Sequence, residues 1–313
     1  GGGSKGAFAV GAIEVLRQQG ITFDLVTGTS TGALIAPMVA TDEIPLLRTI
    51  YSSVRTENIL LRRAGVVDVL AADSIFDTAP LRALVETHIT DARYQRILGS
   101  RTEVELCTTN LQTGDVEYFN PRRSGPGGGA LPVDAFQRAI LASASQPVLM
   151  PAVRVRGTDQ YVDGGVREVT PLRRALDLGA TTIYAIALSP EREDRQDREY
   201  LSVVDTLLRA LDLLLTEVSV GDLDRAEFVN RVLAYLGRVR ANLAASGLGA
   251  ADVDRALETG AASNPLEGRR GLKLIIIRPA TALPVDGLTF SPLVMSQMMT
   301  MGSTAARKAL GIP

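Results

Sequence analysis

The chain has 313 residues, of which 46% are hydrophobic, 22% charged and 4% aromatic, with no Trp. This composition is typical of a globular protein of one large or two ordinary domains, and it excludes a disordered chain, a collagen and a coiled coil. The 33 basic and 35 acidic residues give a formal net charge of −2, so no basic field would attract nucleic acid, and we expect no nucleic-acid polymer as a partner.

A glycine-rich start leads into the first predicted helix. Apolar residues recur at helical spacing over residues 8–16, and Gly20 is a typical helix stop. Residues 23–27 form a short apolar run typical of a buried strand, residues 28–32 predict a tight turn, and residues 33–40 predict the next helix. The sequence therefore predicts a strand, a sharp turn and a helix in direct succession.

Strands and helices alternate along most of the remaining chain. The predicted strands are residues 104–108, 116–119, 153–155, 183–188 and 272–278, and the predicted helices are residues 46–54, 81–88, 135–142 and 171–178. This alternation predicts an α/β fold with a mostly parallel central sheet covered by helices on both faces.

The region 201–260 contains no predicted strand. Two amphipathic helices are expected there, over residues 204–218 and 228–243. We therefore expect a single domain over residues 1–313, with a helical insertion at 201–260 ahead of the last strand.

Cysteine content and apolar run length bear on the compartment. Cys107 is the only cysteine, and its apolar surroundings predict a buried thiol that fits a reducing environment. The best apolar stretch, 207–215, is interrupted by Arg209 and Asp212, so no segment reaches the roughly 18 to 20 apolar residues that span a bilayer. We expect a cytoplasmic protein or one at the periphery of a membrane. The chain begins at Gly1 and not at Met, so a signal peptide upstream of Gly1 is an alternative.

The strongest motif is Gly28-Thr29-Ser30-Thr31-Gly32, a G-x-S-x-G pentapeptide between a predicted strand and a predicted helix. Glycines two positions before and after the serine remove Cβ atoms that would clash where strand and helix nearly touch. The turn then presents the hydroxyl at a helix N-terminus, where unpaired N–H groups favour a developing anion. We predict that Ser30 is a nucleophile held by Gly28 and Gly32; the alternative is that Ser30 or Thr31 simply caps the helix.

The first six residues, Gly1-Gly2-Gly3-Ser4-Lys5-Gly6, allow two interpretations. They satisfy G-x-G-x-x-G, the fingerprint of dinucleotide-binding folds. That fingerprint needs an acidic residue at the end of the next strand, whereas Asp24 lies at the beginning of the predicted strand 23–27, which disfavours this interpretation. In the other interpretation, backbone N–H groups of the glycine run point toward Ser30 and stabilise an oxyanion, because only glycine lets the main chain approach a substrate so closely.

A serine nucleophile needs a general base, usually a histidine. His88, the only histidine, falls at the end of the predicted helix 81–88, where its expected role is to help the C-terminal carbonyls. Asp163 is the other candidate: it ends a strand-like segment, and Gly164 and Gly165 after it allow a tight turn and a close approach to a serine. An ordinary Asp-Gly turn is the alternative. No cluster of potential ligands has metal-binding spacing, so we expect no metal and no other cofactor.

Together these motifs resemble the patatin-like phospholipase family. The resemblance is carried by Gly1-Gly2-Gly3-x-Lys5-Gly6, then Gly28-Thr29-Ser30-Thr31-Gly32, then Asp163-Gly164-Gly165, in the family's order and approximate spacing. Residues 142–151 and 171–179 also look like the family's segments around the aspartate. The resemblance covers about residues 1–190 well and is weak over 201–260.

The resemblance implies a three-layer α/β/α sandwich and a Ser-Asp dyad that works without histidine. Carried over by motif, Ser30 would be the nucleophile, Asp163 the general base, and the backbone of Gly1, Gly2 and Gly3 the oxyanion hole, with Lys5, Gly6, Gly164 and Gly165 supporting these motifs. A carboxylate base has a reference pKa near 3.9 and becomes stronger when it is partly desolvated, so we expect Asp163 to be shielded from water.

We therefore predict a serine acyl hydrolase that cleaves carboxylic esters of phospholipids or lysophospholipids through an acyl-enzyme. Its partner would be a phospholipid or another acyl ester, with peripheral membrane contact as an option. A thioesterase or acyltransferase with the same serine, and a non-catalytic lipid-binding module, are the alternatives. The apolar stripe of the insertion and Met295, Met298 and Met299 either shape an acyl channel or dock on lipid; core filling is the other use of these methionines.

Overall fold

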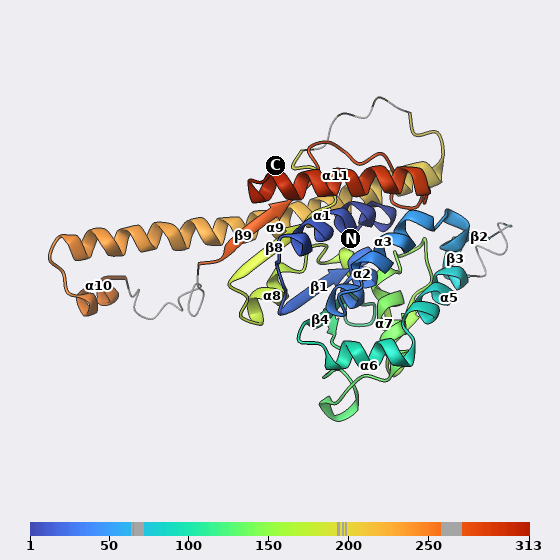
Figure 1. The fold of residues 1–313 in the computed structure, drawn as a ribbon, viewed down its shortest axis with the longest axis horizontal. Helices are drawn as coiled ribbons and strands as arrows, with labels where there is room; N and C mark the ends of the chain where they lie inside the picture. Colours follow the sequence, from blue (N-terminus) through green and yellow to red (C-terminus); the bar gives the residue numbers. More distant parts are fainter. Residues whose placement is uncertain (64, 66–71, 193–194, 196, 198, 258–270) are drawn as a thin grey trace.

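Five strands form the central sheet of the structure, a computed structural model that describes all residues except 64, 66–71, 193–194, 196, 198 and 258–270 (Figure 1). They are β1 (Leu25–Thr29), β4 (Glu103–Asn110), β5 (Val116–Phe119), β6 (Val153–Arg154) and β7 (Gln160–Asp163). The strands β1, β4, β7 and β6 follow one another in this order, and β5 also pairs with β4. β4 therefore connects all the other parts of this sheet.

Helices and two smaller strand pairs complete the described fold. The helices are α1 (Gly6–Gln18), α2 (Thr31–Ala40), α3 (Ile44–Ser53), α5 (Ala79–His88), α6 (Asp91–Gly99), α7 (Val133–Ala144), α8 (Leu172–Asp177), α9 (Val203–Ala245), α10 (Ala250–Leu257) and α11 (Pro292–Leu310). The smaller strand pairs are β8 (Thr182–Ile186) with β9 (Lys273–Ile277) and β2 (Leu61–Arg62) with β3 (Phe76–Asp77). The helices predicted at 8–16, 33–40, 46–54, 81–88, 135–142 and 171–178 are confirmed, while α6 and the pair β2–β3 were not predicted.

β1 and β7 share one edge of β4. On the other edge, β5 pairs with residues 106–109 of β4. β1 runs parallel to β4 up to the pair Thr29–Cys107, and β7 runs antiparallel to β4, ending at the pair Asp163–Thr108. Since β5 occupies the opposite edge at both places, β1 and β7 lie end to end, and their carboxyl ends meet. This register places the residue after Thr29 beside Asp163.

The predicted α/β fold with a helix-covered central sheet is confirmed. Parallel pairing holds for β1 with β4 and for β8 with β9. The pairings of β5, β6 and β7 are antiparallel, so the sheet is more mixed than the sequence pattern predicted. The reason lies in the connections: β4–β5 and β6–β7 are joined by short loops that contain Gly114 and Gly157 at positive φ, and such short loops join antiparallel neighbours.

Alternate side chains of β8 and β9 enter two different cores, as expected for strands covered on both faces. Ile186 and Ile277 pack into the main core, to which α1 and α11 belong. Ala185 packs instead into a smaller core formed with Leu172 of α8 and Leu223 of α9. Helices therefore lie on both sides of the strands, in the arrangement of a three-layer sandwich.

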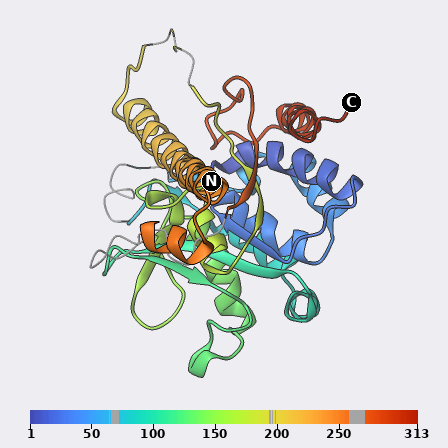
Figure 2. The ribbon, with the colours of Figure 1, turned by 90° about the vertical axis from the view of Figure 1, so that its left-hand side faces the viewer.

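The region 201–260 differs from the prediction of two separate helices. α9 is one continuous helix of 43 residues, followed by α10. Gly221 lies inside α9 without ending it, because an isolated glycine costs only about 1 kcal/mol in a helix and because Leu223 and Ala226 are buried against the body just after it. The distal part of α9 projects from the body with α10 beside its end (Figures 1 and 2). Among the described helices, none is both long enough and apolar enough to cross a membrane.

α1 and α11 pack with their backbones in direct contact. A Cβ at Gly11 would lie 1.8 Å from the carbonyl oxygen of Met299, and a Cβ at Gly302 would lie 1.9 Å from that of Phe8. The three methionines predicted either to contact lipid or to fill the core are buried: Met295, Met298 and Met299. Core filling is therefore the use that the structure shows for them.

Replacing Gly302 by alanine should destabilise the protein, because the new Cβ meets backbone and not a movable side chain. We expect a loss of about 1 to 3 kcal/mol, the usual cost of overpacking. Gly237→Ala is the matched control: Gly237 lies in α9 with nothing within 4 Å of its Cβ position, so alanine should leave the melting temperature unchanged or raise it. Thermal unfolding followed by circular dichroism measures both variants, and equal melting temperatures would contradict this packing.

Candidate active site

Ser30 stands alone between a strand and a helix. β1 ends at Thr29 and α2 begins at Thr31, so the strand, turn and helix predicted around the motif are present. The backbone of Ser30 has φ 58° and ψ −123°, a left-handed conformation that residues other than glycine rarely adopt. Such strain persists only where the surroundings hold it, and it is found most often at functional sites.

The two glycines of the motif have different roles. A Cβ at Gly28 would lie 2.3 Å from the carbonyl oxygen of Gly32 and 2.8 Å from the amide nitrogen of Ala33, so only glycine fits there. A Cβ at Gly32 would meet nothing within 4 Å. The expectation that both glycines prevent a clash is therefore wrong for Gly32, because the strand passes close to the helix on the Gly28 side of the turn.

A buried serine from another helix holds the turn in place. The amide of Ser30 donates to the Ser143 hydroxyl at 3.0 Å, and this hydroxyl donates in turn to the carbonyl of Cys107 at 2.6 Å. Ser143 belongs to α7 and is fully buried, as is Cys107, whose thiol was predicted to be buried. The segment 142–151 resembles the corresponding segment of patatin-like phospholipases, but its local sequence does not indicate this contact. The contact depends on the packing of α7 against β4.

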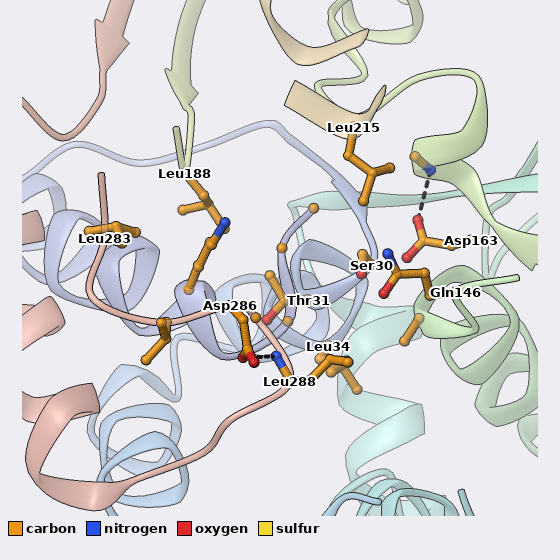
Figure 3. Close-up of a pocket in the computed structure, with 18 of the residues that line it drawn as sticks. Ser30, Thr31, Leu34, Gln146, Asp163, Leu188, Leu215, Leu283, Asp286 and Leu288 are labelled. Atoms are coloured by element: carbon orange, nitrogen blue, oxygen red, sulfur yellow. Dashed lines mark hydrogen bonds between the residues drawn. The ribbon is translucent and has the colours of Figure 1, made fainter. Parts of the chain in front are cut away.

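Asp163 ends β7 and points toward Ser30 (Figure 3). Its Oδ1 accepts a hydrogen bond from the Gly165 amide at 2.7 Å, and only 4% of the residue is exposed. Burial raises the pKa of the Asp163 carboxyl, and the hydrogen bonds from the Ser30 hydroxyl and the Gly165 amide act in the opposite direction. The expected shielding of this carboxylate from water is present.

The two glycines after Asp163 let the main chain turn beneath it. A Cβ at Gly164 would lie 2.5 Å from the carbonyl oxygen of Cys107. A Cβ at Gly165 would lie 3.0 Å both from the Asp163 carboxylate and from the Leu215 side chain of α9. Because these two residues have no side chains, the carboxylate lies close to β4 on one side and to α9 on the other.

The glycine run at the start of the chain lies next to Ser30. A Cβ at Gly1 would lie 3.6 Å from the Ser30 Cβ. Gly2 and Gly3 have φ 130° and 56°. They stand at the start of the 3₁₀ turn η1 (Gly3–Lys5), in which the first amides that donate within the turn are those of Lys5 and Gly6. Within the described part of the chain, neither the Gly2 nor the Gly3 N–H donates a hydrogen bond, so both are available to a bound group.

Lys5 and Gly6 link the glycine run to its neighbours. The Lys5 ammonium lies 2.9 Å from Asp212 of α9, which also binds Arg209 at 3.0 Å. A Cβ at Gly6 would lie 2.2 Å from the Thr31 hydroxyl, so glycine lets α1 begin directly against α2. The start of α1, the start of α2 and the N-terminal part of α9 are thus held together.

A cavity of about 470 Å³ opens beside Ser30 and Asp163 (Figure 3). One wall is apolar and comes from α2, α3 and α5, through residues that include Leu34, Met38, Leu47, Ile50, Leu81 and Val85. Another wall comes from α9 and from the loop 282–290, with Leu188 between them. Throughout the described residues, no group of three or more His, Cys, Asp and Glu side chains is placed to hold a metal ion.

His88 is the last residue of α5, as predicted, and its carbonyl accepts a hydrogen bond from Arg93. Burial and the Arg93 charge lower the pKa of its imidazole. The side chain also lines the apolar wall of the cavity, which the sequence reasoning missed because the packing of α5 decides it. Among the described residues, the Asp163 carboxylate contacts the Ser30 hydroxyl and the Gly165 amide, and His88 is not part of this contact.

α9 clamps the backbone that follows the catalytic candidate Asp163. The Asp222 carboxylate accepts hydrogen bonds from the amides of Val169 and Thr170 at 3.1 and 2.9 Å. The Thr170 hydroxyl also lies 3.2 Å from that of Ser219, one turn earlier in α9. Burial raises the pKa of Asp222 to about 6. This clamp was not predicted, because it depends on where α9 crosses the body.

The structure thus brings the predicted residues into one cavity: a serine at a strained strand–helix turn, a buried carboxylate and an open glycine run. A family model for patatin-like phospholipases matches residues 1–176, more than half of the chain. The chain belongs to the patatin-like phospholipase family. Membership of this family supports lipid acyl hydrolase activity.

Curated relatives are similar at moderate identity. The uncharacterized protein YqhO of Bacillus subtilis is 28% identical, over 62% of this chain and 71% of its own length. The lysophospholipase NTE1 of Scheffersomyces stipitis is 28% identical over 66% of this chain, and the patatin-like phospholipase domain-containing protein ZK370.4 of Caenorhabditis elegans is 29% identical over 77%. The aligned regions make up only 12% and 17% of those two proteins. The solved structure of VipD from Legionella pneumophila aligns with 99% of this chain and 65% of its own, at 13% identity and a TM-score of 0.49.

Asp222→Asn should make the stability less dependent on pH. The folded-state pKa of about 6 lies above the unfolded value near 3.9, so ionisation favours unfolding, and the wild type loses stability as pH rises from about 4 to above 6. Asparagine keeps an acceptor oxygen without this charge. We therefore expect the variant to melt at a higher temperature than the wild type at pH 7.5 and at about the same temperature at pH 4. A variant that melts at a lower temperature than the wild type at pH 7.5 would contradict this expectation. It would show that the ionised carboxylate binds the two backbone amides better than the asparagine side chain does.

Proposed function

We propose that this protein is a serine acyl hydrolase that cleaves carboxylic esters of phospholipids or lysophospholipids, with Ser30 as nucleophile and Asp163 as general base. The observation that carries the proposal is the strained Ser30 at the turn, facing a carboxylate that is 4% exposed. Side chains that serve only packing seldom occupy such strained backbone, whereas nucleophiles on strand–helix turns do.

The raised pKa of Asp163 suits it to the role of base. Burial disfavours the charged carboxylate, which makes it a stronger proton acceptor than an exposed aspartate. In the proposed reaction, Asp163 takes the proton of Ser30 as the oxygen attacks the ester carbonyl. Asp163 then returns that proton to the leaving alcohol and later activates the water that hydrolyses the acyl-enzyme. A carboxylate needs no partner to fix a tautomer, so two residues suffice.

The free amides of Gly2 and Gly3 complete the proposed chemistry. Attack on the carbonyl carbon places a negative charge on the carbonyl oxygen, and backbone donors aimed at that oxygen stabilise the transition state. The run begins next to Ser30, since a Cβ at Gly1 would lie 3.6 Å from the Ser30 Cβ, and donors are needed in this place. Each donor of this kind contributes about 10²- to 10³-fold to the rate.

The apolar wall of the cavity supports a lipid substrate. A wall built from leucine, isoleucine and methionine side chains suits a fatty acyl chain, which gains free energy when it leaves water. The name of the relative NTE1, a lysophospholipase, is consistent with this substrate class. Because such substrates reside in bilayers or micelles, the proposal includes peripheral contact with a lipid surface.

Ser30→Ala should abolish release of fatty acid from vesicles of phosphatidylcholine or lysophosphatidylcholine, while the melting temperature stays close to that of the wild type. Asp163→Asn should lower the rate by about 10²- to 10⁴-fold, because the amide keeps the shape but accepts no proton. Asp222→Asn is the matched control, a partly buried carboxylate that accepts hydrogen bonds from backbone amides but does not contact Ser30. Its rate should stay within a few-fold of the wild type. Folded Ser30→Ala protein with the wild-type rate would contradict the proposal.

His88→Gln separates a dyad from a triad. With His88 only at a helix end and in the cavity wall, its loss should change the turnover of an activated ester by no more than a few-fold and lower the melting temperature slightly. Loss of a general base would instead lower turnover by about 10²- to 10⁴-fold. Turnover of p-nitrophenyl butyrate together with a thermal melt measures this. A folded variant that is a thousandfold slower would make His88 the base.

A further inference from the structure

The loop 282–290 reaches the glycine run from the far end of the chain. It connects β9 to α11, beyond the residues 1–176 that match the family model, and it lines the cavity. At its centre, the carbonyl of Gly287 accepts a hydrogen bond from the amide of Ser4 at 2.9 Å. This amide directly follows Gly3, so the loop is in contact with the proposed oxyanion donors.

The two segments meet backbone to backbone with no side chain between them. A Cβ at Gly3 would lie 2.0 Å from the Gly287 carbonyl oxygen, and a Cβ at Gly287 would lie 3.0 Å from the carbonyl oxygen of Gly2. Gly287 also has φ +93°, a conformation that strains any other residue. Each segment therefore requires glycine in order to approach the other.

The loop is fixed on the C-terminal side of Gly287. Oδ1 of Asp286 accepts hydrogen bonds from the amides of Leu288 and Thr289 at 2.9 and 2.8 Å, which closes a turn around Gly287. The Thr56 hydroxyl then accepts from the amide of Phe290 at 3.0 Å. The Gly287 carbonyl is thus held in one place relative to the body of the protein.

We propose that Gly287 is a positioning residue for the oxyanion hole. Its carbonyl anchors the Ser4 amide and so fixes the Gly2–Gly3 peptides with their free N–H groups toward Ser30. The inference rests on the proposed hydrolase function and adds a part of the chain outside the matched family region to the site. Oxyanion donors act only when they lie about 2.7 to 3.1 Å from the charged oxygen, and misplacement of a reacting group by 1 Å lowers rates by about 10²-fold.

The test compares two glycines with nearly the same positive φ. Gly287→Ala places a side chain at φ +93° and a Cβ 3.0 Å from the Gly2 carbonyl oxygen, whereas Gly247→Ala places one at φ +94°, between α9 and α10, with nothing within 4 Å. With p-nitrophenyl butyrate as substrate, we expect kcat of Gly287→Ala to fall at least about 10-fold while KM changes little. Gly247→Ala should keep the wild-type kcat and KM.

A second variant covers the case in which Gly287→Ala does not fold. Asp286→Ala opens the turn without straining Gly287, and it should lower kcat in the same direction by a smaller factor. In both variants the Ser4 amide should exchange with deuterium faster than in the wild type, a readout that needs no activity. Folded variants with unchanged kcat would overturn the inference, and so would a change in KM alone, which would mark the loop as a wall of the cavity.

The two proposals fail in different ways. If the wild type and Ser30→Ala hydrolyse the ester equally, the hydrolase proposal is wrong, and the Ser4 exchange still decides whether Gly287 anchors the glycine run. If Ser30-dependent turnover is intact in the folded loop variants, the positioning role of Gly287 is wrong and the hydrolase proposal stands.

Discussion

The end-to-end meeting of β1 and β7 on one edge of β4 is the constraint on which the whole site depends. β5 occupies the opposite edge, so the two strands share what is left, one parallel to β4 and the other antiparallel. Their carboxyl ends then meet at the adjacent residues Cys107 and Thr108, which brings Ser30 beside Asp163. A slip of one residue in either ladder would turn these side chains to the opposite face of the sheet.

The remaining parts of the molecule protect and orient this junction. Burial of Asp163 requires that neighbouring segments exclude water from its carboxylate. Glycine at positions 164 and 165 lets β4 and α9 pack close to this carboxylate from two sides. α9 is in turn held by Asp222 and by the ion pair of Asp212 with Lys5, two residues after the glycine run. The long helix, the glycine run and the Ser30 turn therefore form one connected unit around the cavity.

Features with a local cause could be predicted from the sequence. The strand, turn and helix around Ser30 follow from apolar patterning and from Gly28, and most helices follow from their periodicity. The antiparallel placement of β7, the contact of Ser143 with the Ser30 amide and the approach of Gly287 to Gly3 involve residues more than 50 positions apart, and no local pattern encodes them. The continuity of α9 was missed for the same reason, since the burial of Leu223 against α8 outweighs the local effect of Gly221.

We propose that Ser30 is an activated nucleophile because Asp163 lies buried beside it. The most direct measurement is the rate at which a fluorophosphonate probe labels the protein, with the modified residue located by peptide mass spectrometry. We expect a single adduct on the peptide that carries Ser30, and labelling at least about 100-fold slower in Asp163→Asn, as expected when a general base is lost. Labelling of folded Asp163→Asn at the wild-type rate, or an adduct on another residue, would contradict this proposal.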